Sequence, residues 1–228
     1  AIVALTPKFK ENLIGRGIEG DKISIVINGV DIDRFRKTPR DKALAAEWGL
    51  KDKFVIGYIG THGMAHGLSN VLEAAARLRD NDRVMFLFVG DGAERNDLIS
   101  LAAEKGLENV RFIESQPREK VPAIWSVCDV ALVHLRDSVV FSEVIPSKIF
   151  EAMAMELPTL LVAPQGVASD IVLSTRSGVW APAEQPDRLA HVAARLAEKP
   201  RLLEMLGRNG AAASGRFSRR RQAEEMIK

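Results

Sequence analysis

The sequence predicts an α/β fold in which helices cover both faces of a doubly wound parallel sheet. Short apolar runs rich in Val, Ile and Phe recur along the 228 residues, and each is closed by Gly, Asp or Pro. Longer segments of helical period separate these runs, which is the pattern of βαβ units. Because no Ser/Gly-rich linker and no internal repeat divides the chain, we expect one domain over residues 1–228.

The elements alternate in order along the chain. Each predicted strand is a short apolar run, and the runs over 54–59 and 84–89 end at Gly60 and Gly90. Pro146 disfavours helix for the residue before it, so the central helix should begin near Ser147, a natural N-cap. The predicted strands span 2–5, 23–27, 54–59, 84–89, 110–113, 130–135, 159–162 and 178–180. The predicted helices span 7–17, 41–48, 68–79, 93–105, 119–127, 147–156, 167–173 and 185–197, followed by a helical tail.

The composition is that of an ordinary globular protein, with 46% hydrophobic and 27% charged residues. The 32 basic and 30 acidic residues give a formal charge of +2, which is too balanced for a nucleic-acid-binding protein. The cluster Arg216, Arg219, Arg220 and Arg221 fits a solvated helix end better than contact with an anionic membrane, which stays an alternative. No apolar stretch approaches the ~20 residues that span a bilayer.

The single cysteine, Cys128, excludes an intrachain disulfide, which fits a reducing compartment. His62 and His66 are four residues apart, but Gly63 favours a loop over the helix that a zinc pair needs, so we predict no metal site. The chain opens without an initiator methionine in a strand-like run and stops inside a helical pattern. We therefore expect a segment of a longer protein.

The carboxyl ends of the strands are where a doubly wound sheet binds ligands. Glycine-bearing turns follow the predicted strands 23–27, 54–59 and 84–89. They are Asn28-Gly29, Gly60-Thr61-His62-Gly63 and Gly90-Asp91-Gly92. Backbone can approach a ligand closely there, unless the glycines simply serve tight turns between strands and helices. Polar residues follow two further strands, at positions 114–117 and 136–138.

The most informative segment covers residues 143–155. A helix that begins at Ser147 would present the backbone N–H groups of residues 148–150 and the Lys148 side chain at the positive end of its dipole, which is a site for an anion. Glu151 lies about 6 Å along the helix axis from the cap, and Glu143 lies in non-helical chain up to about 13 Å away. Two carboxylates around an anion site suit a nucleotide diphosphate sugar, although a solvated loop residue and a surface helix residue would show the same spacing.

This segment resembles the Glu-x7-Glu signature of the group 1 retaining glycosyltransferases, which have the GT-B fold. Further matches follow in the family's order, with Ile-Val-Ile-Asn-Gly-Val-Asp at 25–31, Phe35, Val-Gly-Asp-Gly at 89–92, Asn-Val-Arg-Phe-Ile at 109–113 and Cys-Asp-Val at 128–130. The resemblance covers essentially the whole chain and is greatest to bacterial enzymes that build surface polysaccharides, including N-acetylfucosamine-type transferases. It implies the C-terminal, Rossmann-like half of such an enzyme.

The resemblance also implies what the site residues do. Glu151 would bind the ribose hydroxyls and Glu143 the transferred sugar. The loop at Glu114 would lie against the nucleobase, and Gly60 with its neighbours would approach the donor phosphates. The donor-binding residues implied are Gly60, Thr61, Gly90, Asp91, Glu114, Ser147, Lys148, Ile149 and Glu151.

One departure from the family pattern concerns the donor phosphates. The family commonly has Arg directly after the glycine at Gly60 and Lys just before the glycine at Gly67, where this chain has Thr61 and His66. We expect His66 and Lys148 to share the electrostatic role. The catalytic candidates are Glu143 and His66. Arg118 is a weaker candidate, and a subfamily with a different donor grip is the alternative.

The predicted function is transfer of a sugar, with retention, from a nucleotide-diphosphate donor to a polyprenol-linked or glycan acceptor. UDP is the favoured nucleotide, and neither a cofactor nor a metal ion is expected. The acceptor would bind an N-terminal domain outside this chain, so we expect the chain alone to be inactive. We expect it in the cytoplasm, with the inner face of the cytoplasmic membrane as an alternative location.

Other functions remain to be weighed against this one. An isolated donor-binding module without activity and a sugar-nucleotide epimerase or hydrolase fit the same glutamate pair. A nicotinamide-dependent dehydrogenase does not, because Gly57, Gly60 and Gly63 have the wrong spacing for its Gly-x-Gly-x-x-Gly fingerprint.

Overall fold

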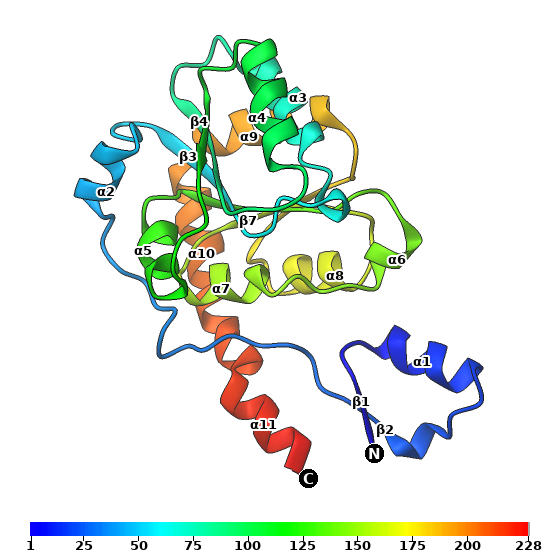
Figure 1. The fold of residues 1–228 in the computed structure, drawn as a ribbon. Coiled ribbons are helices and arrows are strands. Elements are labelled where there is room, and N and C mark those ends of the chain that lie inside the picture. Colours follow the sequence, from blue (N-terminus) through cyan, green and yellow to red (C-terminus); the bar gives the residue numbers. More distant parts are fainter. Residues whose placement is uncertain (228) are drawn as a thin grey trace.

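The computed structural model describes residues 1–227 and contains the predicted parallel sheet (Figure 1). Six strands lie in the order β5-β4-β3-β6-β7-β8, and every pairing is parallel. The strands are β3 (Phe54–Ile59), β4 (Val84–Val89), β5 (Val110–Ile113), β6 (Val130–His134), β7 (Thr159–Val162) and β8 (Gly178–Ala181). The chain runs outward from β3 to β5 and then crosses back to β6, so the strand order reverses between β3 and β6. The doubly wound α/β class is therefore confirmed.

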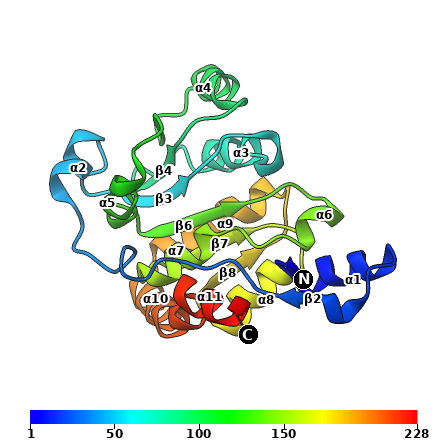
Figure 2. The ribbon, with the colours of Figure 1, turned by 60° about the horizontal axis from the view of Figure 1, so that its bottom comes forward.

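Helices cover both faces of this sheet (Figures 1 and 2). The helices α3 (Ser69–Arg77), α4 (Arg95–Glu104) and α9 (Pro186–Ala197) bury apolar side chains in one core layer. The helices α2 (Lys42–Glu47), α5 (Val121–Ser126), α7 (Lys148–Ala154) and α8 (Val167–Ser174) contribute to the other. In β4, Phe86 and Phe88 face the first layer, whereas Leu87 and Val89 face the second. A strand buried on both faces reads as a continuous apolar run, which is why these strands could be located from the sequence.

The first two predicted strands form a separate sheet. The strands β1 (Ile2–Ala4) and β2 (Ile23–Ile25) pair in parallel with each other, and α1 (Pro7–Gly15) connects them. In Figure 1 this segment, in dark blue, lies apart from the six-stranded sheet. The side chains of Val3 and Ile25 are 44% and 38% exposed, so this pair lacks the two covered faces of the main sheet.

The predicted helical tail is confirmed for the C-terminal region. It contains two helices, α10 (Pro200–Ser214) and α11 (Arg219–Ile227), separated by a 3₁₀ turn at Gly215–Phe217. This turn is tied to the segment that precedes α2. The N–H of Val30 donates to the carbonyl oxygen of Phe217 at 2.9 Å, and the N–H of Arg219 donates to that of Val30 at 3.0 Å. Phe217 also stacks on Phe150 of α7, with 4.7 Å between the ring centroids.

A further difference is the short helix α6 (Val139–Ser142), which the sequence did not predict. Three apolar residues in a row, Val139, Val140 and Phe141, show no helical period. The helix follows β6, and it brings Glu143 to its C-terminal end.

Candidate functional site

A cleft lies over the carboxyl ends of β3, β4 and β5, beside the point where the strand order reverses. It consists of two adjoining cavities of about 250 and 370 Å³, which share Ile59, Gly60, Thr61 and Val121. We call the two cavities together the central cleft. Ligand sites of doubly wound sheets lie at this position, and their volumes are typically about 300–1,000 Å³.

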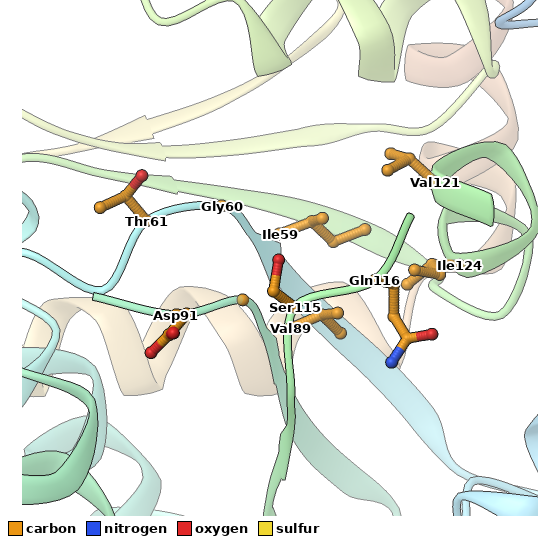
Figure 3. Close-up of a pocket in the computed structure, with 10 residues that line it drawn as sticks. Ile59, Gly60, Thr61, Val89, Asp91, Ser115, Gln116, Val121 and Ile124 are labelled. Carbon is orange, nitrogen blue, oxygen red and sulfur yellow. The ribbon is translucent and has the colours of Figure 1, made fainter. Parts of the chain in front are cut away.

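The smaller cavity lies between the turns that follow β3, β4 and β5 and the helix α5 (Figure 3). Its walls are mostly apolar, with Ile59, Val89 and Ile124 among them, and Ser115 and Gln116 add polar groups. The predicted residues Thr61, Gly90 and Asp91 line it as well. Glu114 is exposed and does not line either cavity, whereas the two residues after it do.

The turns after β3 and β4 bring backbone directly to the cleft. Gly60 and Gly90 have φ angles of +146° and +147°, a region that other residues rarely adopt. A Cβ on Gly90 would overlap the carbonyl oxygen of Gly60, so the two turns touch backbone to backbone. A Cβ on Gly60 would lie 2.9 Å from Nζ of Lys148. Because Gly60 has no side chain, the ammonium group of Lys148 has room beside this turn.

The larger cavity is lined by the start of α7 and by the predicted residues Ser147, Lys148, Glu151, His66 and Arg118. Nζ of Lys148 lies 3.8 Å from the centroid of the Tyr58 ring, which is a cation–π contact. Across residues 1–227 no carboxylate lies within ion-pair distance of this ammonium group. Burial lowers the pKa of Lys148 to about 8, and the charge of Glu151 opposes that shift. The cleft thus holds an unpaired cation that an anionic ligand can neutralise.

The backbone at the start of α7 differs from the expectation. Ser147 is itself in helical conformation, and its side chain makes no capping hydrogen bond. The N–H of Ile149 donates to the carbonyl oxygen of Pro146 at 3.1 Å, and that of Phe150 to Ser147 at 3.0 Å. The prediction that residues 148–150 present three free N–H groups is therefore wrong, because the helix starts with a tight turn. The side chain of Ile149 is fully buried in the core and faces away from the cleft.

Glu151 is held by a residue that the sequence did not indicate. Nε1 of Trp125, a fully buried side chain on α5, donates to Oε2 of Glu151 at 3.1 Å. No described residue bonds to the other carboxylate oxygen, Oε1. The hydrogen bond fixes the orientation of the carboxylate and leaves one oxygen for a ligand. Nothing in the sequence reveals this pair, since the two residues are 26 positions apart.

Glu143 lies at the C-terminal end of α6 and is partly buried. It does not line either cavity of the central cleft, and its carboxylate has no hydrogen-bond partner among the described residues. Its place follows β6, the strand next to β3 at the reversal point. Of the two glutamates of the predicted pair, Glu151 therefore lines the cleft and Glu143 does not.

Three of the four histidines lie at or near the ends of β3 and β6 and have different surroundings. His62 is fully buried against Tyr58, Phe88 and Phe112, and burial lowers its pKa to about 4. His66 lines the larger cavity, whereas His134 lies at the end of β6 and is 1% exposed. No group of three side chains suited to a metal ion was found within residues 1–227.

No helix in the described part of the chain is both long and apolar enough to cross a bilayer. The arginine cluster lies in the 3₁₀ turn at Gly215–Phe217 and on α11, where Nε of Arg219 donates to the carbonyl oxygen of Gly29 at 3.2 Å and Arg221 pairs with Glu225 at 3.2 Å.

Known proteins are similar to this chain in sequence. The sequence model of the family "Glycosyl transferases group 1" matches residues 41–213. The chain is 32% identical over 157 residues to the "Putative colanic acid biosynthesis glycosyl transferase WcaI" of Escherichia coli (strain K12), covering 68% of this chain and 38% of that protein. It is 32% identical over 153 residues to the "Probable glycosyltransferase WbjE" of Pseudomonas aeruginosa, covering 67% of this chain and 37% of the relative.

A solved structure has the same fold. A crystal structure of Anabaena Alr3699/HepE in complex with UDP superposes with a TM-score of 0.85 at 22% identity, covering 99% of this chain and 62% of that one. The expected Rossmann-like half of a GT-B fold is thereby confirmed. The chain spans less than half the length of the two curated relatives. Because the family model matches most of its length, the chain belongs to the group 1 glycosyl transferases.

Proposed function

We propose that this chain binds the nucleotide-diphosphate sugar donor of a retaining glycosyltransferase, with UDP as the nucleotide. The observation that carries the proposal is the unpaired ammonium group of Lys148, which lies below the Gly60 turn in a cleft that also presents the carboxylate of Glu151. A cation and a carboxylate in one cleft suit a ligand that carries a diphosphate and a ribose diol.

The order of groups along the central cleft matches the order of groups in such a donor. The apolar cavity beside Ser115 and Gln116 has room for the nucleobase. Glu151, at the boundary with α5, accepts hydrogen bonds from the ribose hydroxyls through Oε1. Lys148, with backbone at Gly60, neutralises the diphosphate. The transferred sugar then extends toward the β6 side, where His66 and Glu143 lie.

The chemistry needs stabilisation of the charge that develops on the departing diphosphate. A preorganised ammonium group in a partly dry cleft supplies this without moving during the reaction. Lys148 takes the place of the Arg and Lys that the family pattern has near Thr61 and His66. We also propose that the sugar is transferred with retention of its anomeric configuration, that Glu143 contacts the sugar and that no metal ion takes part.

The biological setting comes from the relatives. One is named for colanic acid biosynthesis, and the HepE structures contain UDP or UDP-glucose. We assign this chain to bacterial surface polysaccharide synthesis, with an N-acetylfucosamine-type sugar and a polyprenol-linked or glycan acceptor. The protein would act in the cytoplasm, where the arginines of α11 can contact the inner face of the membrane. Since the relatives are much longer, we expect the 228 residues to bind donor without transferring sugar.

Isothermal titration with UDP and GDP tests the proposal. We expect UDP to bind more tightly than GDP, and Lys148→Met to weaken UDP binding by roughly 10- to 100-fold, as expected for a charge-assisted hydrogen bond. The matched control is Lys51→Met, which removes an exposed lysine outside the cleft and should leave binding unchanged. The proposal is wrong if neither UDP nor GDP binds, or if Lys148→Met binds UDP as tightly as the wild type does. Incubation with a UDP-sugar and an acceptor lipid, followed by product analysis, tests whether the chain alone transfers sugar.

A further inference from the structure

Two histidines join the neighbouring strands β3 and β6 by a reciprocal contact. Nδ1 of His134, at the end of β6, lies 2.6 Å from the carbonyl oxygen of His66, and Nδ1 of His66 lies 3.4 Å from the carbonyl oxygen of His134. A carbonyl oxygen only accepts hydrogen bonds, so each Nδ1 must carry a proton and donate. We call this the histidine clasp. It fixes the turn that contains His66 at the point where the strand order reverses.

The clasp determines what the rest of the His66 ring can do. Burial and the nearby charge of Lys148 lower the pKa of His66, against the opposing effect of the bond to His134. Above about pH 6.5, the ordinary pKa of an imidazole, the ring is therefore neutral, and the clasp places its one proton on Nδ1. Nε2 then carries a lone pair, and no residue within the described chain bonds to it. His66 lines the cleft, so the ring offers this cavity a hydrogen-bond acceptor and no charge.

An acceptor without charge does not suit a diphosphate. The bridging diphosphate of a nucleotide sugar has no proton to donate at neutral pH, and its oxygens repel a nitrogen lone pair. Hydroxyl groups and amide N–H groups are the donors that such a nitrogen binds. The sequence suggested that His66 shares the neutralising role with Lys148, whereas the clasp assigns these two residues different partners.

The place of His66 in the cleft indicates which part of the ligand it meets. Lys148 lies against the Tyr58 ring and below Gly60, and the His66 ring contacts Tyr58 with 5.7 Å between centroids. The smaller cavity, which we assign to the nucleobase, lies on the β4 and β5 side of Gly60, whereas the histidine clasp joins His66 to β6. A donor whose diphosphate lies at Lys148 therefore places its sugar near His66.

From this arrangement we infer that Nε2 of His66 accepts a hydrogen bond from a hydroxyl or amide N–H of the transferred sugar, so that His66 selects the sugar and Lys148 serves the diphosphate. This inference rests on the proposed function, because it needs a nucleotide sugar in the central cleft.

Isothermal titration of each protein with UDP and with three UDP-sugars separates the role of His66 from that of Lys148. The ligands are UDP, UDP-glucose, UDP-galactose and UDP-N-acetylglucosamine, and the proteins are wild type, His66→Ala and His66→Asn. An asparagine amide can still donate to the carbonyl oxygen of His134 but has no atom at the place of Nε2. His191→Ala is the control, because that histidine is exposed on α9 and far along the chain from the clasp.

We expect both His66 variants to bind UDP within about twofold of wild type. Their affinity for the UDP-sugar that wild type prefers should fall by about three- to tenfold, the size of one neutral hydrogen bond. Lys148→Met should show the opposite pattern and weaken UDP and the UDP-sugars alike. His191→Ala should change neither.

Three results would overturn the inference. Equal weakening of UDP and UDP-sugars in His66→Asn would assign His66 to the diphosphate. Unchanged binding of every ligand would leave the sugar without a contact at Nε2. A wild type in which no sugar changes the affinity for UDP would show that the contact contributes nothing. Failure of the proposed function is a separate result, since the wild type would then bind neither UDP nor any UDP-sugar.

Discussion

Replacement of Glu151 by glutamine removes the carboxylate that we expect to contact the ribose, and it changes little else. The amide oxygen of glutamine can accept the hydrogen bond that Nε1 of Trp125 now donates to Oε2 at 3.1 Å. The NH₂ group then replaces Oε1 and cannot accept from a hydroxyl. A hydrogen bond to a charged group contributes about 1.5–3 kcal/mol, so the Kd for UDP should rise roughly 10- to 100-fold.

The assay is isothermal titration with UDP, accompanied by urea unfolding of each variant. Glu151→Gln should keep the wild-type stability, whereas Glu151→Ala leaves the buried Nε1–H of Trp125 without an acceptor and should cost about 1–3 kcal/mol. Glu198→Gln, at the exposed end of α9, is the control and should behave as wild type. If Glu151→Gln binds UDP as tightly as wild type, the assignment of Glu151 to the ribose is wrong.

Three further changes test other parts of the account. Burial lowers the pKa of Lys148 to about 8, so its ammonium group is charged below that pH and the affinity for UDP-glucose should fall as the pH rises from 7.5 to 9.5. The variant Lys148→Arg keeps its charge over this range, so its affinity should not change with pH. The same pH dependence in both proteins would contradict this. Gly90→Ala forces a Cβ against the carbonyl oxygen of Gly60 and should lower stability by about 1–3 kcal/mol in urea unfolding, whereas Gly215→Ala, with open space around it, should not. Burial raises the pKa of the Cys128 thiol, so it should react with a thiol reagent only when the chain unfolds, and rapid labelling of the native protein would refute that placement.

The main sheet could be predicted from the sequence because its strands are continuous apolar runs with sharp ends. The run over β4 is buried at every position, and Gly90 marks its end. Which strands pair with each other could not be predicted in the same way, because a short apolar strand has the same sequence pattern in either sheet. The strands β1 and β2 therefore look like members of the main sheet, although they pair only with each other. The helix α6 was missed because four residues are too few to show a period.

The site could be predicted in part. The spacing within α7 places Lys148 and Glu151 at one helix start, and both line the central cleft. The contacts that orient these groups join distant positions, since Trp125 reaches Glu151 across 26 residues and His66 reaches His134 across 68. Such pairs depend on how helices and turns pack on the sheet, and no local pattern encodes them. Glu143 shares the predicted spacing, but it lies at the end of α6 and does not line either cavity.

A crystal structure of the chain with UDP would test the central claim most directly. We expect the uracil in the cavity beside Ser115 and Gln116, a ribose hydroxyl within hydrogen-bond distance of Oε1 of Glu151, and the diphosphate on Nζ of Lys148. UDP bound elsewhere, or in the cleft with its diphosphate away from Lys148, would contradict it.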